Sequence, residues 1–156
     1  MSQHWLLTAA LVLGCTAPGN RPVPNMDPAR FTPELEAQLE AQFARSALAW
    51  NRGDLDGFMA DYAPDTLPTF IAGGHLRRGF DFIRRNYASR FAPGAARDSL
   101  RFEEFDVRPI SDGFVLVTAR FILYRNGTTN SSGPFTLLME HRPEGWKILH
   151  DHSSSD

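Results

Sequence analysis

Cysteine is almost absent from this chain of 156 residues, which contains a single one, Cys15. One cysteine excludes an intramolecular disulfide and a metal site built from several thiolates. No apolar run approaches the roughly 20 residues that a membrane-spanning helix needs. No basic block offers a surface for nucleic acid, and there is no glycine-rich phosphate loop, nucleophile elbow or His-Glu-x-x-His pair. We therefore predict no metal, no cofactor and no nucleic-acid partner.

The composition is that of one globular domain with a short appendage. Sixteen basic residues oppose 18 acidic ones, which gives a formal net charge of -2. Hydrophobic residues make up 42% of the chain, and phenylalanine, with 12 residues, is the main aromatic. This apolar content is enough to form a buried core.

The first 15 residues resemble an export signal. Residues 5–13 form a short apolar run, and the following Gly14-Cys15 completes a segment that resembles a bacterial lipobox. We predict a signal peptide over residues 1–15, lipidation at Cys15, and an exported protein of the periplasm or cell surface that contacts the membrane only through this lipid. An ordinary secretory signal, with Cys15 present by chance, is the alternative. The proline-rich residues 16–30 are predicted to form an extended tether.

The folded domain is predicted to cover residues 31–156 and to begin with three amphipathic helices. Thr32 followed by proline indicates a helix start, and apolar residues recur at spacings of three and four up to a terminal glycine at position 53. A shorter helix is expected over residues 55–62 and a third over residues 80–91. Each has one apolar face that must pack against a partner surface.

A small hairpin is expected over residues 67–78, between the second and third helices. The second half of the domain is predicted to form four strands, separated by turns and by a polar loop at 126–133, over residues 100–111, 114–125, 134–142 and 146–154. We therefore expect an α+β fold in which a cone-shaped, curved antiparallel sheet is wrapped by about three helices. A cone of this kind can leave an internal cavity at its open end.

Both ends of the domain resemble a known family. Residues 49–56 (Ala-Trp-Asn-Arg-Gly-Asp-Leu-Asp) with Phe58 and Tyr62, and residues 145–154 (Gly-Trp-Lys-Ile-Leu-His-Asp-His-Ser-Ser), resemble SnoaL-like domains of the nuclear transport factor 2-like superfamily. The closing strand is also similar to the association domain of calcium/calmodulin-dependent kinase II, which ends in Trp-x-x-x-His-x-His. The resemblance implies a cystatin-like fold over residues 31–156. It selects no function, because the superfamily includes isomerases, cyclases, dehydratases, binding subunits and oligomerisation modules.

The closing strand supplies the candidate catalytic residues, His150 and His152. Residues two apart share a face of a strand, and a turn at residues 144–145 makes the even-numbered residues the more apolar row. We therefore predict that both imidazoles face the cavity and that Asp151 points outward. Three interpretations stay open: space-filling histidines with satisfied hydrogen bonds, ligand binding or acid–base catalysis near neutral pH, and metal binding, for which a third ligand is missing.

Four further residues are predicted to bind a ligand. Arg120 lies in the middle of a strand among apolar residues, where an arginine needs an anion or solvent. The kinase resemblance implies that it faces the pocket, and a rim or dimer-interface arginine is the alternative. Trp50, Tyr62 and Tyr87 are predicted to line the same cavity, although their spacing is also that of ordinary core residues. The still more apolar opposite face of residues 114–125 either reverses the inward assignment or is buried in a homodimer.

Two functions follow from these patterns. The first is an exported, lipid-anchored and homodimeric domain that binds an unknown small molecule or a partner without catalysis. The second is a small lyase or isomerase of SnoaL or ketosteroid-isomerase type that acts on a hydrophobic metabolite, including an anionic one. Its base would be one of the two histidines, with Arg120 or Tyr62 as the electrophilic partner. No carboxylate falls on the predicted inner face, because Asp61 is expected to be solvated and Asp151 to point outward, so the sequence leaves open whether the protein is an enzyme.

Overall fold

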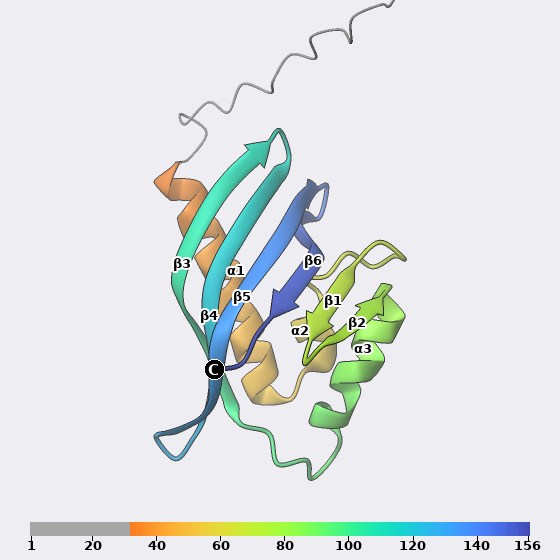
Figure 1. The fold of residues 1–156 in the computed structure, drawn as a ribbon, viewed down its shortest axis with the longest axis vertical. Helices are drawn as coiled ribbons and strands as arrows, with labels where there is room; N and C mark the ends of the chain where they lie inside the picture. The colour runs from red at the N-terminus through yellow and green to blue at the C-terminus, as the bar shows by residue number, and fades with distance from the viewer. Residues whose placement is uncertain (1–31) are drawn as a thin grey trace, which may run out of the picture.

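A computed structural model describes residues 32–156, so the predicted signal peptide, the lipidation site Cys15 and the tether lie outside the described residues. The described chain folds into helices packed on a curved sheet (Figure 1). The elements are α1 (Pro33–Arg52), α2 (Leu55–Met59), β1 (Thr69–Ala72), β2 (His75–Arg78), α3 (Phe80–Ala88), the 3-10 helix η2 (Ser89–Phe91), β3 (Ser99–Ser111), β4 (Phe114–Arg125), β5 (Thr128–Arg142) and β6 (Gly145–Ser153). Over these residues, no helix has the length and apolar character needed to cross a membrane.

Helix α1 begins and ends where its sequence predicts. The Thr32 hydroxyl accepts a hydrogen bond from a first-turn backbone N–H at 3.2 Å, and Pro33 occupies the first helical position. Gly53 ends the helix with a φ of 81°, in the left-handed region that favours glycine. Between these caps, Leu39 and Phe43 are buried in the core against the sheet, which fixes the helix across one face.

The sheet is curved, unclosed and mixed, with the strand order β2-β1-β6-β5-β4-β3. Strands β3 to β6 form the predicted antiparallel meander. Strand β1, however, pairs with β6 in parallel, so the expectation of a wholly antiparallel sheet is wrong at this junction. The small hairpin adds itself to the free edge of β6, a pairing that local sequence patterns do not reveal. The predicted α+β cone is otherwise confirmed, with the helices packed on the concave side (Figure 1).

Two turns differ from the prediction. Residues 128–133, predicted as part of a polar loop, belong to β5 and pair with the end of β4. The reason is the turn at Asn126 and Gly127, which have φ values of 52° and 79°. Both values lie in the left-handed region, as in the Asn-Gly hairpin turns that keep two strands paired. The turn between β5 and β6 is formed by residues 143–144, because Arg142 pairs with Gly145, and not by residues 144–145 as expected.

A β-bulge in β6 decides which side chains reach the interior. Met139 pairs with Ile148, but the preceding residue Leu138 pairs with His150, so Leu149 is the extra residue in the ladder. One extra residue on one strand shifts the alternation of its side chains by one position. The two rows of β6 therefore exchange faces at Leu149.

The exchange places Asp151 and Ser153 on the concave face and the two histidines on the outer face. Asp151 is buried, whereas His150 is half-buried and His152 is exposed. The prediction that His150 and His152 point inward is therefore wrong, and so is the prediction that Asp151 points outward. The physical reason is the bulge, since strict alternation from the apolar start of the strand gives the opposite result.

The structure also shows which face of β4 points to the core. Val115, Val117 and Ala119 are buried in the core shared with α1, so the more apolar face of this strand points inward. Arg120 therefore lies on the outer face. Of the two alternatives for the apolar face, reversal of the inward assignment is the one that the structure shows. That face no longer argues for a dimer.

Candidate functional site

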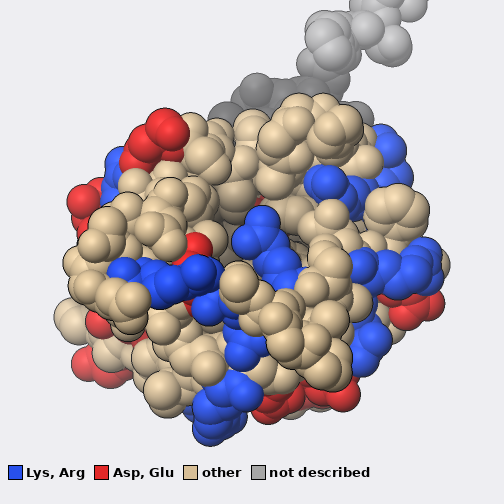
Figure 2. Space-filling view, turned by 90° about the horizontal axis from the view of Figure 1, so that it is seen from below, with Lys and Arg blue, Asp and Glu red and all other residues tan. Residues whose placement is uncertain are grey.

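A cavity of about 560 Å³ lies between the helices and the concave face of the sheet. It reaches the surface at the lower end of the molecule, where Figure 2 shows a hollow. Its wall is rich in aromatic side chains, among them Phe43, Trp50, Phe58, Phe70, Phe102 and Phe135. These rings come from helices and strands that are far apart in sequence, so the cavity forms only when the cone closes.

Trp50 and Tyr87 belong to a cluster of rings around Phe58. The centroids of Trp50 and Phe58 lie 5.0 Å apart, as do those of Phe58 and Tyr87, both in edge-to-face geometry. Phe70 stacks on Tyr87 at 5.5 Å. The indole N–H of Trp50 donates to the backbone carbonyl of Asp98 at 2.8 Å. Trp50 therefore presents an apolar surface to the cavity, while its N–H is used in a hydrogen bond to the backbone.

A polar cluster centred on Asp151 interrupts this apolar wall. The hydroxyl of Tyr62 donates to Oδ2 of Asp151 at 2.5 Å, and the hydroxyl of Ser153 donates to Oδ1 at 2.9 Å. Burial raises the pKa of Asp151 to about 6, although both hydrogen bonds oppose the rise. A carboxyl group that titrates close to neutral pH can accept a proton and return it. Asp151 therefore combines a fixed geometry with acid–base capacity at the cavity wall.

The hydroxyls of Tyr62 and Tyr87 extend the cluster. Burial and the neighbouring Asp151 carboxylate hold the pKa of Tyr62 well above its usual value, and they also raise the pKa of Tyr87. Both phenols therefore stay protonated at physiological pH. The proton of Tyr62 is committed to Asp151, whereas Tyr87 lines the cavity with a hydroxyl that can donate to a bound molecule.

A second buried carboxylate, Asp61, also lines the cavity. The side-chain amide of Gln42 donates to Oδ1 of Asp61 at 2.9 Å, and Oδ2 is buried with no hydrogen-bond partner among residues 32–156. Burial raises the pKa of Asp61 to about 6, with Gln42 and Ser46 opposing the rise. The prediction that Asp61 is solvated is wrong. Its carbonyl accepts from the N–H of Ile148 at 2.7 Å, which draws the residue in between α1 and β6.

The structure brings together half of the residues predicted to bind a ligand. Three line the cavity, namely Trp50, Tyr62 and Tyr87, and three do not, namely Arg120, His150 and His152. Nδ1 of His150 lies 2.7 Å from the Thr69 hydroxyl on the neighbouring strand, and partial burial lowers the pKa of His150. This geometry matches the structural interpretation of His150. Over the described part of the chain, no group of three or more His, Cys, Asp or Glu residues could hold a metal ion.

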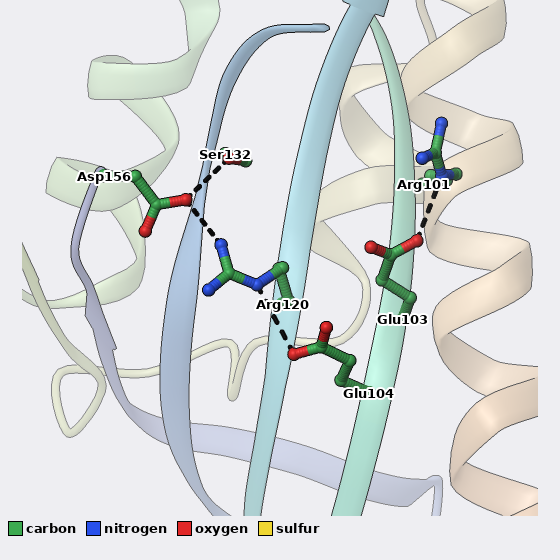
Figure 3. A network of polar contacts seen from close by, with 6 residues as sticks. All are labelled: Arg101, Glu103, Glu104, Arg120, Ser132 and Asp156. Carbon is green, nitrogen blue, oxygen red and sulfur yellow. Dashed lines mark hydrogen bonds and ion pairs between the residues drawn. The ribbon is translucent and has the colours of Figure 1, made fainter.

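Arg120 forms ion pairs with two carboxylates of the same chain (Figure 3). Its Nη1 donates to Oδ2 of Asp156 at 2.5 Å, and its Nε lies 3.4 Å from a carboxylate oxygen of Glu104. The hydroxyl of Ser132 donates to the same Asp156 oxygen at 2.7 Å. The expected pocket-facing arginine is thus an outer-face residue that fixes the C-terminal segment across β4 and β5.

That segment forms part of the cavity wall. The N–H of Ser154 donates to the carbonyl of Pro134 at 3.0 Å, and the next residue, Ser155, lines the cavity. Gly133 permits the close contact, since a Cβ at this position would lie 1.8 Å from the carbonyl oxygen of Ser154. Any side chain at position 133 would displace the segment from the sheet.

Sequence reasoning missed Asp151, Ser153, Arg77 and Arg90, all of which line the cavity. The first two depend on the bulge, for which the strand pattern carries no signal. The two arginines had a signal, because residues 75–97 contain six arginines and one acidic residue. This excess of arginine over acidic residues is the sequence signal for the basic side of the site.

Comparison with known proteins agrees with this fold. The model of the SnoaL-like domain family matches residues 39–155. A nuclear transport factor 2-like protein of unknown function from Shewanella oneidensis is 30% identical, with a TM-score of 0.66 over 79% of this chain and 99% of that one.

Two further solved structures share the fold. A cystatin-like domain of unknown function from Nostoc punctiforme is 25% identical, with a TM-score of 0.63 over 80% of this chain and 78% of that one. A nuclear transport factor 2-like protein of unknown function from Pseudomonas putida is 15% identical, with a TM-score of 0.63 over 79% and 87% of the two chains. A comparison with curated proteins gave no match. From the family match and the shared architecture, the chain belongs to the SnoaL-like domain family of the nuclear transport factor 2-like superfamily.

Proposed function

We propose that this SnoaL-like domain binds a small, predominantly apolar molecule in its cavity. The observation that carries the proposal is the cavity itself, whose volume of about 560 Å³ falls within the roughly 300–1,000 Å³ typical of ligand pockets. Aromatic walls supply affinity by burying apolar surface, and a few polar groups fix the orientation of the ligand. A purely structural module would be expected to fill such a space with side chains, since protein interiors are close-packed.

Filling the cavity tests this proposal. Ala72 lines the cavity, and its neighbour Ile71 belongs to the opposite face of β1. We expect Ala72→Phe to weaken binding of the neutral fluorescent probe N-phenyl-1-naphthylamine by about tenfold or more, because the added ring occupies the probe's space. The matched variant Ile71→Phe should bind the probe as the wild type does. Equal binding by all three proteins would contradict a cavity-bound ligand.

A second candidate function, proton transfer on the bound molecule, is favoured by the buried Asp151 carboxylate with its raised pKa. In this lyase or isomerase, Asp151 removes a proton from a carbon next to a carbonyl group, and the electron pair moves to the carbonyl oxygen. Tyr87 donates a hydrogen bond to the oxyanion that forms. The proton then returns to another carbon, or a leaving group departs from the neighbouring carbon. The base is a carboxylate and not one of the two histidines.

Hydrogen exchange at carbon tests the second candidate. We would follow deuterium uptake by 2-tetralone in D₂O by NMR, corrected for the uncatalysed rate. Asp151→Asn, which keeps an acceptor for Tyr62, should lower the rate by about 10²-fold or more, and the wild-type rate should rise with pH through an apparent pKa of about 6. The double variant His150→Gln/His152→Gln should retain the activity. Loss of exchange in the histidine variant but not in Asp151→Asn would contradict this assignment.

We further propose that the domain is exported and lipid-anchored to a bacterial membrane, in the periplasm or at the cell surface. The apolar run before Cys15 supports this proposal. A labelled fatty acid should be incorporated into the wild type and not into Cys15→Ala. Labelling of both proteins, or of neither, would contradict the anchor.

A homodimer through the outer face of the sheet is also proposed. Its support is the half-buried cross-strand pair of Leu116 and Leu138 on that face. Sedimentation equilibrium should give twice the monomer mass for the wild type and the monomer mass for Leu138→Lys. A monomeric wild type at micromolar concentration would contradict the dimer.

A further inference from the structure

The mouth of the cavity is electropositive, although the whole chain carries a formal net charge of -2. Residues 75–97, which include β2, α3 and η2, contain six arginines and one acidic residue, and two of these arginines, Arg77 and Arg90, line the cavity. Figure 2 shows Lys and Arg side chains gathered around the hollow at the lower end of the molecule, with acidic side chains mostly farther out. A cleft bordered by charges of one sign concentrates the field and attracts ligands of the other sign.

Arg77 reaches the cavity from β2. It pairs with Phe70 across the β1–β2 hairpin, and its guanidinium carbon lies 5.6 Å from the centroid of the Phe70 ring. Its Nη1 donates to the carbonyl of His75 at 3.3 Å, and it forms no ion pair with any residue of the described chain. A guanidinium has five N–H donors, so most of those of Arg77 are free for a ligand.

Arg90 reaches the cavity from η2, which directly follows α3. Within residues 32–156 its guanidinium has no hydrogen bond or ion pair, and only its backbone carbonyl accepts a bond, from Arg97 at 3.2 Å. The charges of Arg90 and Arg77 both oppose the rise in the pKa of Tyr87. Arg77, Arg90 and Tyr87 all line the same cavity.

We propose that Arg77 and Arg90 bind the carboxylate of an otherwise apolar ligand, whose hydrocarbon body extends inward along Phe70 and Tyr87 towards Asp151. This inference rests on the proposed small-molecule function and names its ligand class. Guanidinium groups match the two oxygens of a carboxylate, and the bonds are charge-assisted.

A ligand with its carboxylate at the inner end of the cavity is disfavoured, because that end already holds two buried carboxyl groups. Asp61 and Asp151 both line the cavity away from solvent, and a second carboxylate beside them would have to ionise against like charge in a poorly solvated space. The anionic group of the ligand is therefore held at the half-buried Arg77 and the exposed Arg90, and the uncharged end of the ligand meets Asp151. Arg120, predicted to serve the anion, is occupied by Asp156 on the other face of the sheet.

A pair of probes that differ only in charge tests the proposal, 4-phenylbutyrate and 4-phenylbutan-1-ol, with calorimetric titration of the full folded domain at low and high salt. We expect the acid to bind about tenfold more tightly than the alcohol, with the difference shrinking as salt rises. Arg77→Gln/Arg90→Gln should lower the affinity for the acid to that for the alcohol and leave the alcohol unaffected. Arg90→Gln alone, at an exposed side chain, should give part of this loss.

The matched control is Arg78→Gln, which removes the same charge from the adjacent, exposed residue on the other face of β2. It should keep the preference for the acid. Equal affinities of the wild type for the two probes, or an unchanged preference in the double variant, would overturn the anion site while leaving the cavity proposal in place. Failure of both probes to bind, with N-phenyl-1-naphthylamine still bound, would count against the carboxylic acid class, and failure of all three would count against both proposals.

Discussion

Two regions of the cavity wall hold a buried carboxylate in opposite ways. At the end of β6, both oxygens of Asp151 accept hydrogen bonds from hydroxyl groups. Between α1 and β6, Asp61 has one oxygen bonded to Gln42 and one buried without a partner among the described residues. Burial nevertheless raises the pKa of each carboxyl to about 6. The pKa values therefore do not distinguish the two regions. The number of carboxylate oxygens that accept a hydrogen bond does distinguish them.

The largest expected effect concerns both carboxylates together. Their folded-state pKa values of about 6 lie above the ordinary value of 3.8, so the folded state binds more protons than the unfolded state between these limits. The free energy of unfolding should therefore increase as the pH falls from 7 to 5, by about 2–3 kcal/mol in total. Urea unfolding at the two pH values measures this change.

One group opposes that gain. Burial lowers the pKa of His150, so its contribution to stability is lost as the pH falls, and a His150→Gln background removes this opposing effect. The acids with lowered pKa values, Asp65 and Asp156, lose their contributions only below the ordinary value of 3.8. A domain that becomes less stable between pH 7 and pH 5, even with His150→Gln, would show that the two carboxylates are not buried as described.

Removing the donor of Asp151 should have the next largest effect. Tyr62→Phe leaves an ionised, buried oxygen without its hydrogen bond, so the free energy of unfolding at pH 7 should fall by about 2 kcal/mol. The loss should be smaller at pH 5, where Asp151 is mostly protonated. Denaturant unfolding at both pH values separates this effect from a simple packing defect, which would be the same at each pH.

Neutralising Asp61 should change stability in the other direction. Asp61→Asn keeps an acceptor for Gln42 and removes a poorly satisfied charge, so we expect an increase of about 1 kcal/mol at pH 7. The increase should vanish near pH 5, because the wild-type carboxyl is then largely neutral. A destabilised Asp61→Asn at pH 7 would mean that the two regions do not differ as their hydrogen bonds indicate.

The smallest expected difference compares two serines. Ser153→Ala removes a donor to Asp151 and should cost about 0.5–1 kcal/mol at pH 7. Ser46→Ala near Asp61 should cost less, because Oδ1 of Asp61 keeps its bond from Gln42 and Oδ2 already lacks a partner among the described residues, whereas Ser153→Ala removes the donor to Oδ1 of Asp151. Both values come from the same unfolding measurement, and a larger cost for Ser46→Ala would reverse the ranking of the two regions.

The helices were predictable from sequence because their signals are local. Thr32, Pro33 and Gly53 act on the chain immediately around them, so α1 begins and ends as predicted. The parallel pairing of β1 with β6 has no such signal, since it joins two segments that lie far apart in the sequence. The cone and three of its lining residues were therefore accessible from sequence.

Which side chains at the end of β6 face the cavity could not be predicted from the sequence. Up to Ile148, alternation places the apolar residues inward as predicted, and then the register with β5 shifts by one residue. This shift belongs to the pairing between β5 and β6, and the sequence around His150 and Asp151 carries no local signal for it. The basic mouth, in contrast, could have been inferred from the excess of arginine in residues 75–97.

The bulge at Leu149 makes strand register a determinant of chemistry. A regular ladder that kept Leu149 and paired it with Leu138 would turn the imidazoles of His150 and His152 into the cavity and the Asp151 carboxylate out of it. No ligand-contacting side chain would need to be replaced. In a strand that closes over a hollow, forming or losing a single bulge is thus equivalent to exchanging one proton-transfer group for another.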